Sequence, residues 1–162
     1  MNAAQPDAGI TTKIINPLLA AVSETFDMML GCPVEREQLA LRAFEAELYD
    51  LSAVIGITGS AKGAICISFP ANTALSLVDA FIGEKSSRIT PSVVDAMGEL
   101  VNIVAGATKS KMKLGLNMGL PNVVHGKRHK VDLPTDSKPM RVSYSSALGP
   151  FLVDFGFVVR VV

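Results

Sequence analysis

The pattern of apolar and polar positions predicts one long helix in the middle of the chain, from Thr90 to about Leu114. Thr90 is a good N-cap, and Pro91 suits the first helical position because the N–H that proline lacks would be unpaired there. Near the C-terminus, lysines complement the helix dipole and Gly115 can adopt the left-handed cap. At about 100° per residue, one face gathers the positions that we expect to be buried, namely Val93, Met97, Leu100, Val101, Val104 and Thr108.

The opposite face of this helix carries polar side chains and a glycine. Spaced four, three, four and three residues apart, these positions lie within roughly 80° of one another: Asp95, Glu99, Asn102, Gly106 and Lys109. A carboxylate and a carboxamide one turn apart form a polar strip against which a partner can dock. Most such pairs on exposed helices have no function, so the strip alone also fits a merely solvated surface.

An earlier segment also predicts a helix. From Thr11 onward, apolar residues recur at helical spacing, and Gly31 closes the helix. Pro17 leaves two possibilities for its beginning. Either Asn16 caps the helix with Pro17 in first position, or an earlier turn is kinked at Pro17.

The remaining regular segments favour strands. Residues 48–58 and 63–69 are separated by a turn-rich link over 59–62, which is typical of an antiparallel hairpin. Two further strand candidates are weaker, at 38–44 and 121–124. A second hairpin covers 141–145 and 151–162. Its last strand is nearly continuous in apolar residues and therefore needs cover on both faces, by helices on one side and by a partner subunit on the other.

A short helix follows the first hairpin, with Asn72 or Thr73 as its cap and Gly83 at its end. The fold class is therefore α+β, with helices packed on a largely antiparallel sheet. Residues 60–69 (SAKGAICISF) and 146–155 (SALGPFLVDF) also resemble each other. Chance and a duplicated half explain this echo equally well.

Composition narrows the class of protein. With 162 residues, a single domain over 1–162 is the default, with 1–10 loosely ordered. The 15 basic and 15 acidic residues cancel, which leaves no electrostatic signal for nucleic acid or an anionic membrane. No apolar run reaches membrane-spanning length, and no signal peptide is visible. Cys32 and Cys66 are isolated in the sequence, as expected in the reducing cytoplasm.

Three other candidate sites have little support. The basic run His125–Lys130 has no acidic or thiol ligand at metal-binding spacing, so we interpret it as a solvated loop and expect no metal site. Gly56–Gly63 (GITGSAKG) lacks the GK[ST] ending of a phosphate-binding loop and leads into a strand. No Gly-x-Ser-x-Gly motif supports a serine hydrolase.

The central helix, with Asp95-x-x-x-Glu99-x-x-Asn102-x-x-x-Gly106, resembles the signature of the CheC/CheX/FliY phosphatases of bacterial chemotaxis. Further CheX-like segments occur in the same order from about residue 14 to 126, such as 54–59 (VIGITG) and 98–102 (GELVN). The first helix offers only Ala20-x-x-x-Glu24-x-x-Asp27. Because Asp cannot donate as Asn does, we expect one active site, as in CheX.

The resemblance implies long helices over an antiparallel sheet with a pseudo-twofold repeat, and a cytoplasmic homodimer. It also implies a phosphatase that acts on the aspartyl phosphate of a CheY-like response regulator. Asn102 would orient the attacking water and Glu99 would pair with a lysine of the regulator, while Asp95 and Gly106 would contribute to docking. No cofactor of its own is implied, because the phosphorylated regulator carries Mg²⁺.

Two alternatives remain open from the sequence. The chain could be a CheX-like docking module in chemotaxis or two-component signalling that hydrolyses nothing. It could also act on a different phosphorylated partner, because response regulators share their active-site chemistry. The sequence does not identify which regulator is served, or whether the loop at His125–Lys130 contacts it.

Overall fold

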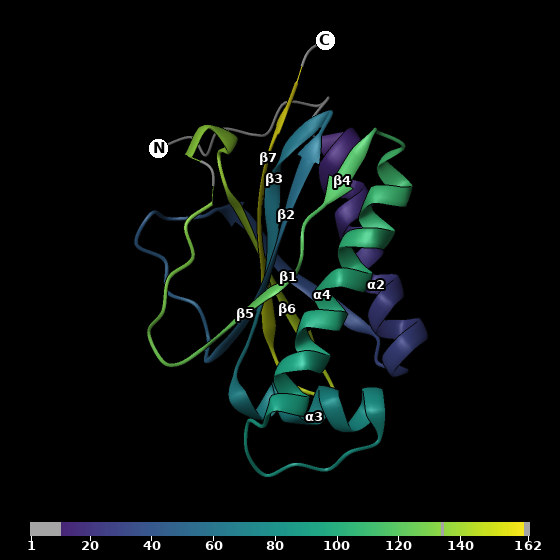
Figure 1. Ribbon diagram of the computed structural model, residues 1–162, viewed down its shortest axis with the longest axis vertical. Coiled ribbons are helices and arrows are strands. Elements are labelled where there is room, and N and C mark those ends of the chain that lie inside the picture. The colour runs from purple at the N-terminus through teal and green to yellow at the C-terminus, as the bar shows by residue number, and fades with distance from the viewer. Residues whose placement is uncertain (1–10, 134, 161–162) are drawn as a thin grey trace.

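The computed structural model describes residues 11–133 and 135–160 (Figure 1). The loose start expected for residues 1–10 lies outside this part. The helical elements are the π-helical turn η1 (Thr11–Ile15), α2 (Asn16–Leu30), α3 (Ala71–Ile82), α4 (Pro91–Met112) and the 3₁₀ turn η2 (Thr135–Ser137). The strands are β1 (Val34–Leu41), β2 (Leu51–Gly59), β3 (Ala61–Phe69), β4 (Leu116–Met118), β5 (Asn122–His125), β6 (Met140–Ser146) and β7 (Phe151–Val159).

All the strands form one antiparallel seven-stranded sheet, in the order β1-β6-β7-β3-β2-β4, with β5 also paired to β2. Helices α2 and α4 cover one face of it, and α3 packs against both helices at one end of the sheet (Figure 1). The α+β class expected from the sequence is therefore confirmed.

The strand order has an internal twofold pattern. When β1 is exchanged with β4 and β5, β2 with β6, and β3 with β7, the result is the same strand order read from the opposite edge of the sheet. In this exchange α2, which precedes β1, corresponds to α4, which precedes β4. Of the two echoing segments, residues 61–69 form β3 and residues 151–155 lie in β7, the two central strands, which pair with each other. Part of the echo therefore lies on strands that this exchange relates.

The first helix begins earlier than a cap at Asn16 would allow. Residues Thr11–Ile15 form a π-helical turn that leads directly into α2, and Ile15 has helical dihedral angles. Of the two possibilities for this beginning, the earlier turn is thus the correct one. Proline has no N–H to donate and its ring crowds the preceding turn, so the wider π-helical turn accommodates Pro17. The C-terminal end is as predicted, with Gly31 in the left-handed conformation.

Helix α4 begins at the predicted cap but ends at a different one. Thr90 is the N-cap, and its Oγ1 accepts a hydrogen bond from Val93 N at 3.4 Å. The C-terminal cap is Lys113 rather than Gly115, because the helix ends one residue after Lys111 and Lys113 itself takes the left-handed conformation. The predicted capping glycine was therefore wrong by two positions.

The short helix α3 is capped from elsewhere in the chain. It begins at Ala71 after Pro70, and neither Asn72 nor Thr73 caps it. Instead, Asp50, the residue just before β2, accepts a hydrogen bond from Ala71 N at 2.9 Å through Oδ2. Local spacing could not reveal this cap, because the two residues meet only after β2 and β3 have paired.

The strands differ from their predicted bounds mainly at the sheet edges. The first strand was expected at 38–44, but β1 covers Val34–Leu41, where charged side chains are tolerated because it is an edge strand with exposed positions. The hairpin link predicted over 59–62 shrinks to a turn at Ser60. β4 was not predicted, and β5 begins one residue later than expected.

The second face of the sheet is covered by the chain itself. Leu48, Cys66 and Leu152 form a small buried cluster there. Beside it, Asp154 is 1% exposed and accepts two hydrogen bonds from Arg141, at 2.7 and 2.9 Å, while Arg42 Nε lies 2.9 Å from its Oδ2. The cover that β7 was expected to need from a partner subunit is thus supplied within this chain.

Candidate functional site

Helix α4 separates its faces as the periodicity predicted. Its core-facing side chains are buried, and Thr108, the polar member of that face, donates to the carbonyl of Val104 at 2.8 Å. On the other face, Asp95 and Glu99 are exposed, while Asn102 and Gly106 are half-buried. All the predicted site residues therefore lie on one helix face, with Glu99 and Asn102 one turn apart.

The side chains of this strip are free to meet a partner. Asp95, Glu99 and Asn102 make no side-chain hydrogen bond or ion pair with any other residue that the structure describes. Space above Gly106 is open, since a Cβ built there would have no described atom within 4 Å. A carboxylate and an amide without intramolecular partners retain their full capacity to bind groups from another molecule.

Gly98 allows Pro121 and β5 to lie close beside the strip. A Cβ built at Gly98 would be 3.5 Å from Val123 Cγ2 and 3.9 Å from Pro121 Cβ. Gly98 precedes Glu99 and stands one turn before Asn102, so Pro121 and Val123 border the two predicted functional residues. Sequence reasoning missed this border. The signal for it was a glycine inside a helical pattern, which often marks a close packing contact.

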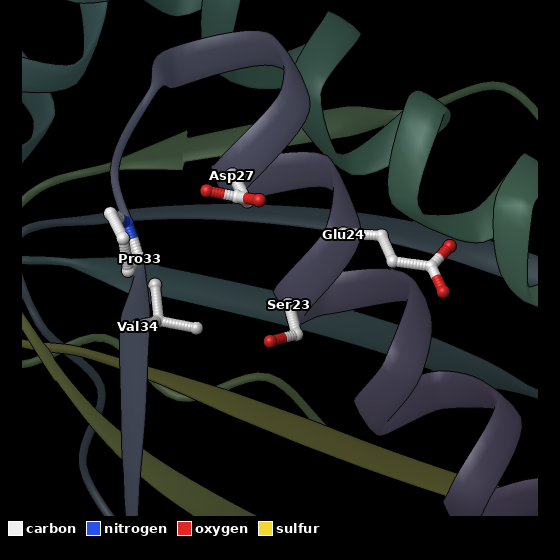
Figure 2. Close-up of a pocket in the computed structure, with 5 residues that line it drawn as sticks. All are labelled: Ser23, Glu24, Asp27, Pro33 and Val34. Carbon is white, nitrogen blue, oxygen red and sulfur yellow. The ribbon is translucent and has the colours of Figure 1, made fainter.

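The twofold pattern gives this site a counterpart on α2. Ser23, Glu24 and Asp27 correspond to Gly98, Glu99 and Asn102, and together with Pro33 and Val34 they line an open hollow (Figure 2). Glu24 points away from Pro33 and Val34 in Figure 2, and its Oε2 lies 2.7 Å from Lys111 Nζ. The counterpart therefore has an aspartate in place of the amide and a glutamate already paired with a lysine.

Comparison with known proteins places this architecture in a family. The family described as chemotaxis phosphatase CheX matches residues 51–145, which include Glu99 and Asn102. The CheY-P phosphatase CheX of Thermotoga maritima is 32% identical over 123 residues, covering 74% of this chain and 79% of that protein. This chain belongs to the CheX family.

Solved structures agree with the family assignment. A CheC-like superfamily protein from Shewanella sp. PV-4 has a TM-score of 0.81 at 28% identity, covering 89% of this chain and 96% of its own. A Borrelia burgdorferi CheX was solved as a complex with CheY, BeF₃ and Mg²⁺. It shares the fold with a TM-score of 0.76 at 22% identity, covering 88% of this chain and 96% of its own.

The basic loop of this CheX family member is more ordered than a solvated loop. His129 is half-buried, with Nδ1 2.7 Å from the carbonyl oxygen of Gly126 and Nε2 2.6 Å from Ser52 Oγ. Lys130 forms an ion pair with Glu45. The loop thus fastens to the face of the sheet opposite α4, so the expectation of a merely solvated loop was wrong for His129.

No group of three or more His, Cys, Asp or Glu side chains in residues 11–133 and 135–160 is arranged to hold a metal ion. Cys32 and Cys66 are free and buried, and burial raises the pKa of the Cys66 thiol to about 12, which disfavours the reactive thiolate. None of the helices described is long and apolar enough to cross a membrane.

Proposed function

We propose that this protein hydrolyses the aspartyl phosphate of a CheY-like response regulator, using Asn102 and Glu99. The observation that carries the proposal is the pair of exposed Glu99 and half-buried Asn102, whose side chains have no partner among the described residues, in a chain of the CheX family. The related CheY-P phosphatase CheX of Thermotoga maritima supports the reaction class.

Asn102 supplies what hydrolysis of an acyl phosphate requires. The phosphoryl group is already held by the regulator with its own Mg²⁺, so the reaction needs a water molecule aligned opposite the leaving carboxylate oxygen. A carboxamide can accept a hydrogen bond from that water and donate another elsewhere. Orienting the water in this way lowers the entropic part of the barrier, as a glutamine does in GTPases.

Glu99 fixes the approach of Asn102. Its carboxylate pairs with a lysine beside the regulator's phosphorylation site through a charge-assisted hydrogen bond. Asp95 and Gly106, one turn on either side of the pair, contribute to docking. The phosphatase brings no cofactor of its own, because the regulator carries the Mg²⁺. We place this reaction in the cytoplasm, and a homodimer, which the family resemblance implies, can be tested by sedimentation.

The experiment that tests the function is phosphate loss from a response regulator of the same cell, labelled with acetyl phosphate or by its kinase. Adding this protein in catalytic amounts should accelerate the loss. Binding of the regulator without acceleration would favour a docking module. Acceleration with a regulator outside chemotaxis would assign the same chemistry to a different partner.

Glu99→Ala should weaken binding of the regulator about tenfold and lower turnover at subsaturating regulator, because it removes one side of a charged contact. Calorimetric titration with the BeF₃-loaded regulator measures the first effect and phosphate release the second. The matched control is Glu24→Ala, which removes the corresponding carboxylate of α2 and should change neither. Lost turnover with unchanged affinity would instead give Glu99 a direct chemical role.

Gly106→Ala separates stability from docking. The space above Gly106 is open and alanine is the better helix former, so this variant should be more stable by about 0.5–1 kcal/mol. If the partner's surface lies close to the helix here, the added methyl group should also weaken binding of the regulator. Thermal unfolding and titration test the two parts, and unchanged affinity would remove Gly106 from the docking surface.

A further inference from the structure

The border beside the α4 strip contains a β-bulge. β4 and β5 both pair with β2, through Ile57↔Met118 and Val54↔Asn122. Two residues of β2 therefore face three residues of the other chain segment, 119–121. Gly119 still donates its N–H to the Gly56 carbonyl at 2.9 Å, so the extra residue lies after it. Bulges of this kind bend an edge strand and redirect its side chains, and they are frequent next to active sites.

Leu120 lies in this bulge, directly before Pro121. On either side of the bulge, Met118 and Val123 pack against the core beneath the helices. Pro121 borders Gly98 on α4, whereas Leu120 is 85% exposed, more than any other large hydrophobic residue described.

A single exposed leucine is ordinary on a protein surface. The position of Leu120 is unusual, however, because Leu120 lies in a bulge next to Pro121, and Pro121 packs on α4 beside Glu99 and Asn102. The strip carries charges of both signs, with the negative Glu99 toward its N-terminal end and the positive, exposed Lys109 toward its C-terminal end. A partner lying along it meets a carboxylate, an amide, an ammonium group and, to one side, an apolar side chain.

We infer that Leu120 is an apolar docking contact for the phosphorylated response regulator, which it meets beside the phosphorylation site. The inference rests on the proposed function, since the partner is the same regulator. Charges along the strip orient the regulator, and the chemistry that Glu99 and Asn102 address is common to regulators. An apolar contact outside that chemistry adds affinity and discriminates among regulators by the side chains around their phosphorylation sites.

The test uses the full chain and a CheY-like regulator of the same cell loaded with BeF₃ and Mg²⁺, which removes turnover from the binding measurement. Leu120→Ala should raise the Kd about fivefold and Leu120→Asp at least about tenfold, because each removes a buried apolar contact and the second also buries a charge. With the phosphorylated regulator, KM should rise in parallel while kcat at saturation stays within about twofold.

The matched control is Phe44→Asp. Phe44 is 79% exposed and lies in the segment between Arg42 and Leu48, which packs on the opposite face of the sheet. This variant should bind as the natural protein does, and circular dichroism should show all three variants folded. A Leu120→Asp Kd within twofold of the natural protein overturns the inference, as does absence of any binding by the natural protein. Intact Leu120-dependent binding without phosphate release would instead refute the phosphatase proposal alone.

Discussion

Asn102→Ala is expected to abolish the stimulated loss of phosphate from the regulator, with kcat reduced at least about 100-fold. The reason is geometric, because alanine leaves nothing to hold the attacking water in line with the leaving oxygen. Folding should be unaffected, since Asn102 is half-buried and its side chain makes no hydrogen bond with another described residue. Steady-state phosphate release at saturating regulator measures the effect, with thermal unfolding run in parallel.

Asn102→Asp tests whether hydrogen bonding by the amide, and not only the size of the side chain, is needed to orient the water. The carboxylate has the shape of the amide but cannot donate a hydrogen bond, and it places a negative charge beside the phosphoryl group, so its activity should be no better than that of alanine. Asp27→Ala on α2 is the control at the corresponding position, and it should retain full activity. Full activity of either Asn102 variant would remove this residue from the mechanism.

Asp154→Asn is expected to cost about 3 kcal/mol of unfolding free energy and to lower Tm by roughly 6–12 °C. Asp154 is the buried carboxylate that Arg42 and Arg141 share, so a neutral amide leaves two guanidinium groups facing each other without their counter-charge. The pKa of Arg141 is raised by its hydrogen bond to Asp154, so the arginine stays charged in this setting. Calorimetry measures the change.

The exposed Asp132→Asn provides the control and should leave Tm unchanged. A second variant tests the electrostatic cause, since replacing Arg42, Arg141 and Asp154 together by apolar residues should recover much of the stability lost in Asp154→Asn. The ion cluster lies on the face opposite α4, so phosphate release per folded molecule should stay constant. A Tm within about 2 °C of the natural protein for Asp154→Asn would show that the cluster contributes little.

Local sequence was sufficient to predict α4 and its two faces. Thr90 caps the helix within one turn, and the periodicity that buries Val93 and Met97 necessarily turns Glu99 and Asn102 outward. These features depend on residues three or four positions apart, which meet as soon as the helix forms. The two hairpins were predictable for the same reason, because each is closed by a short turn.

Only the tertiary structure decided what surrounds this helix. β1 pairs with β6, β4 and β5 pair with β2, and Asp50 caps α3, all through contacts between residues distant in the sequence. Edge strands carry weak patterns of their own because main-chain hydrogen bonds to a neighbouring strand define them. The bulge at Leu120 depends on the register of two such pairings, so the residues of the strip could be predicted from the sequence and the apolar side chain beside them could not.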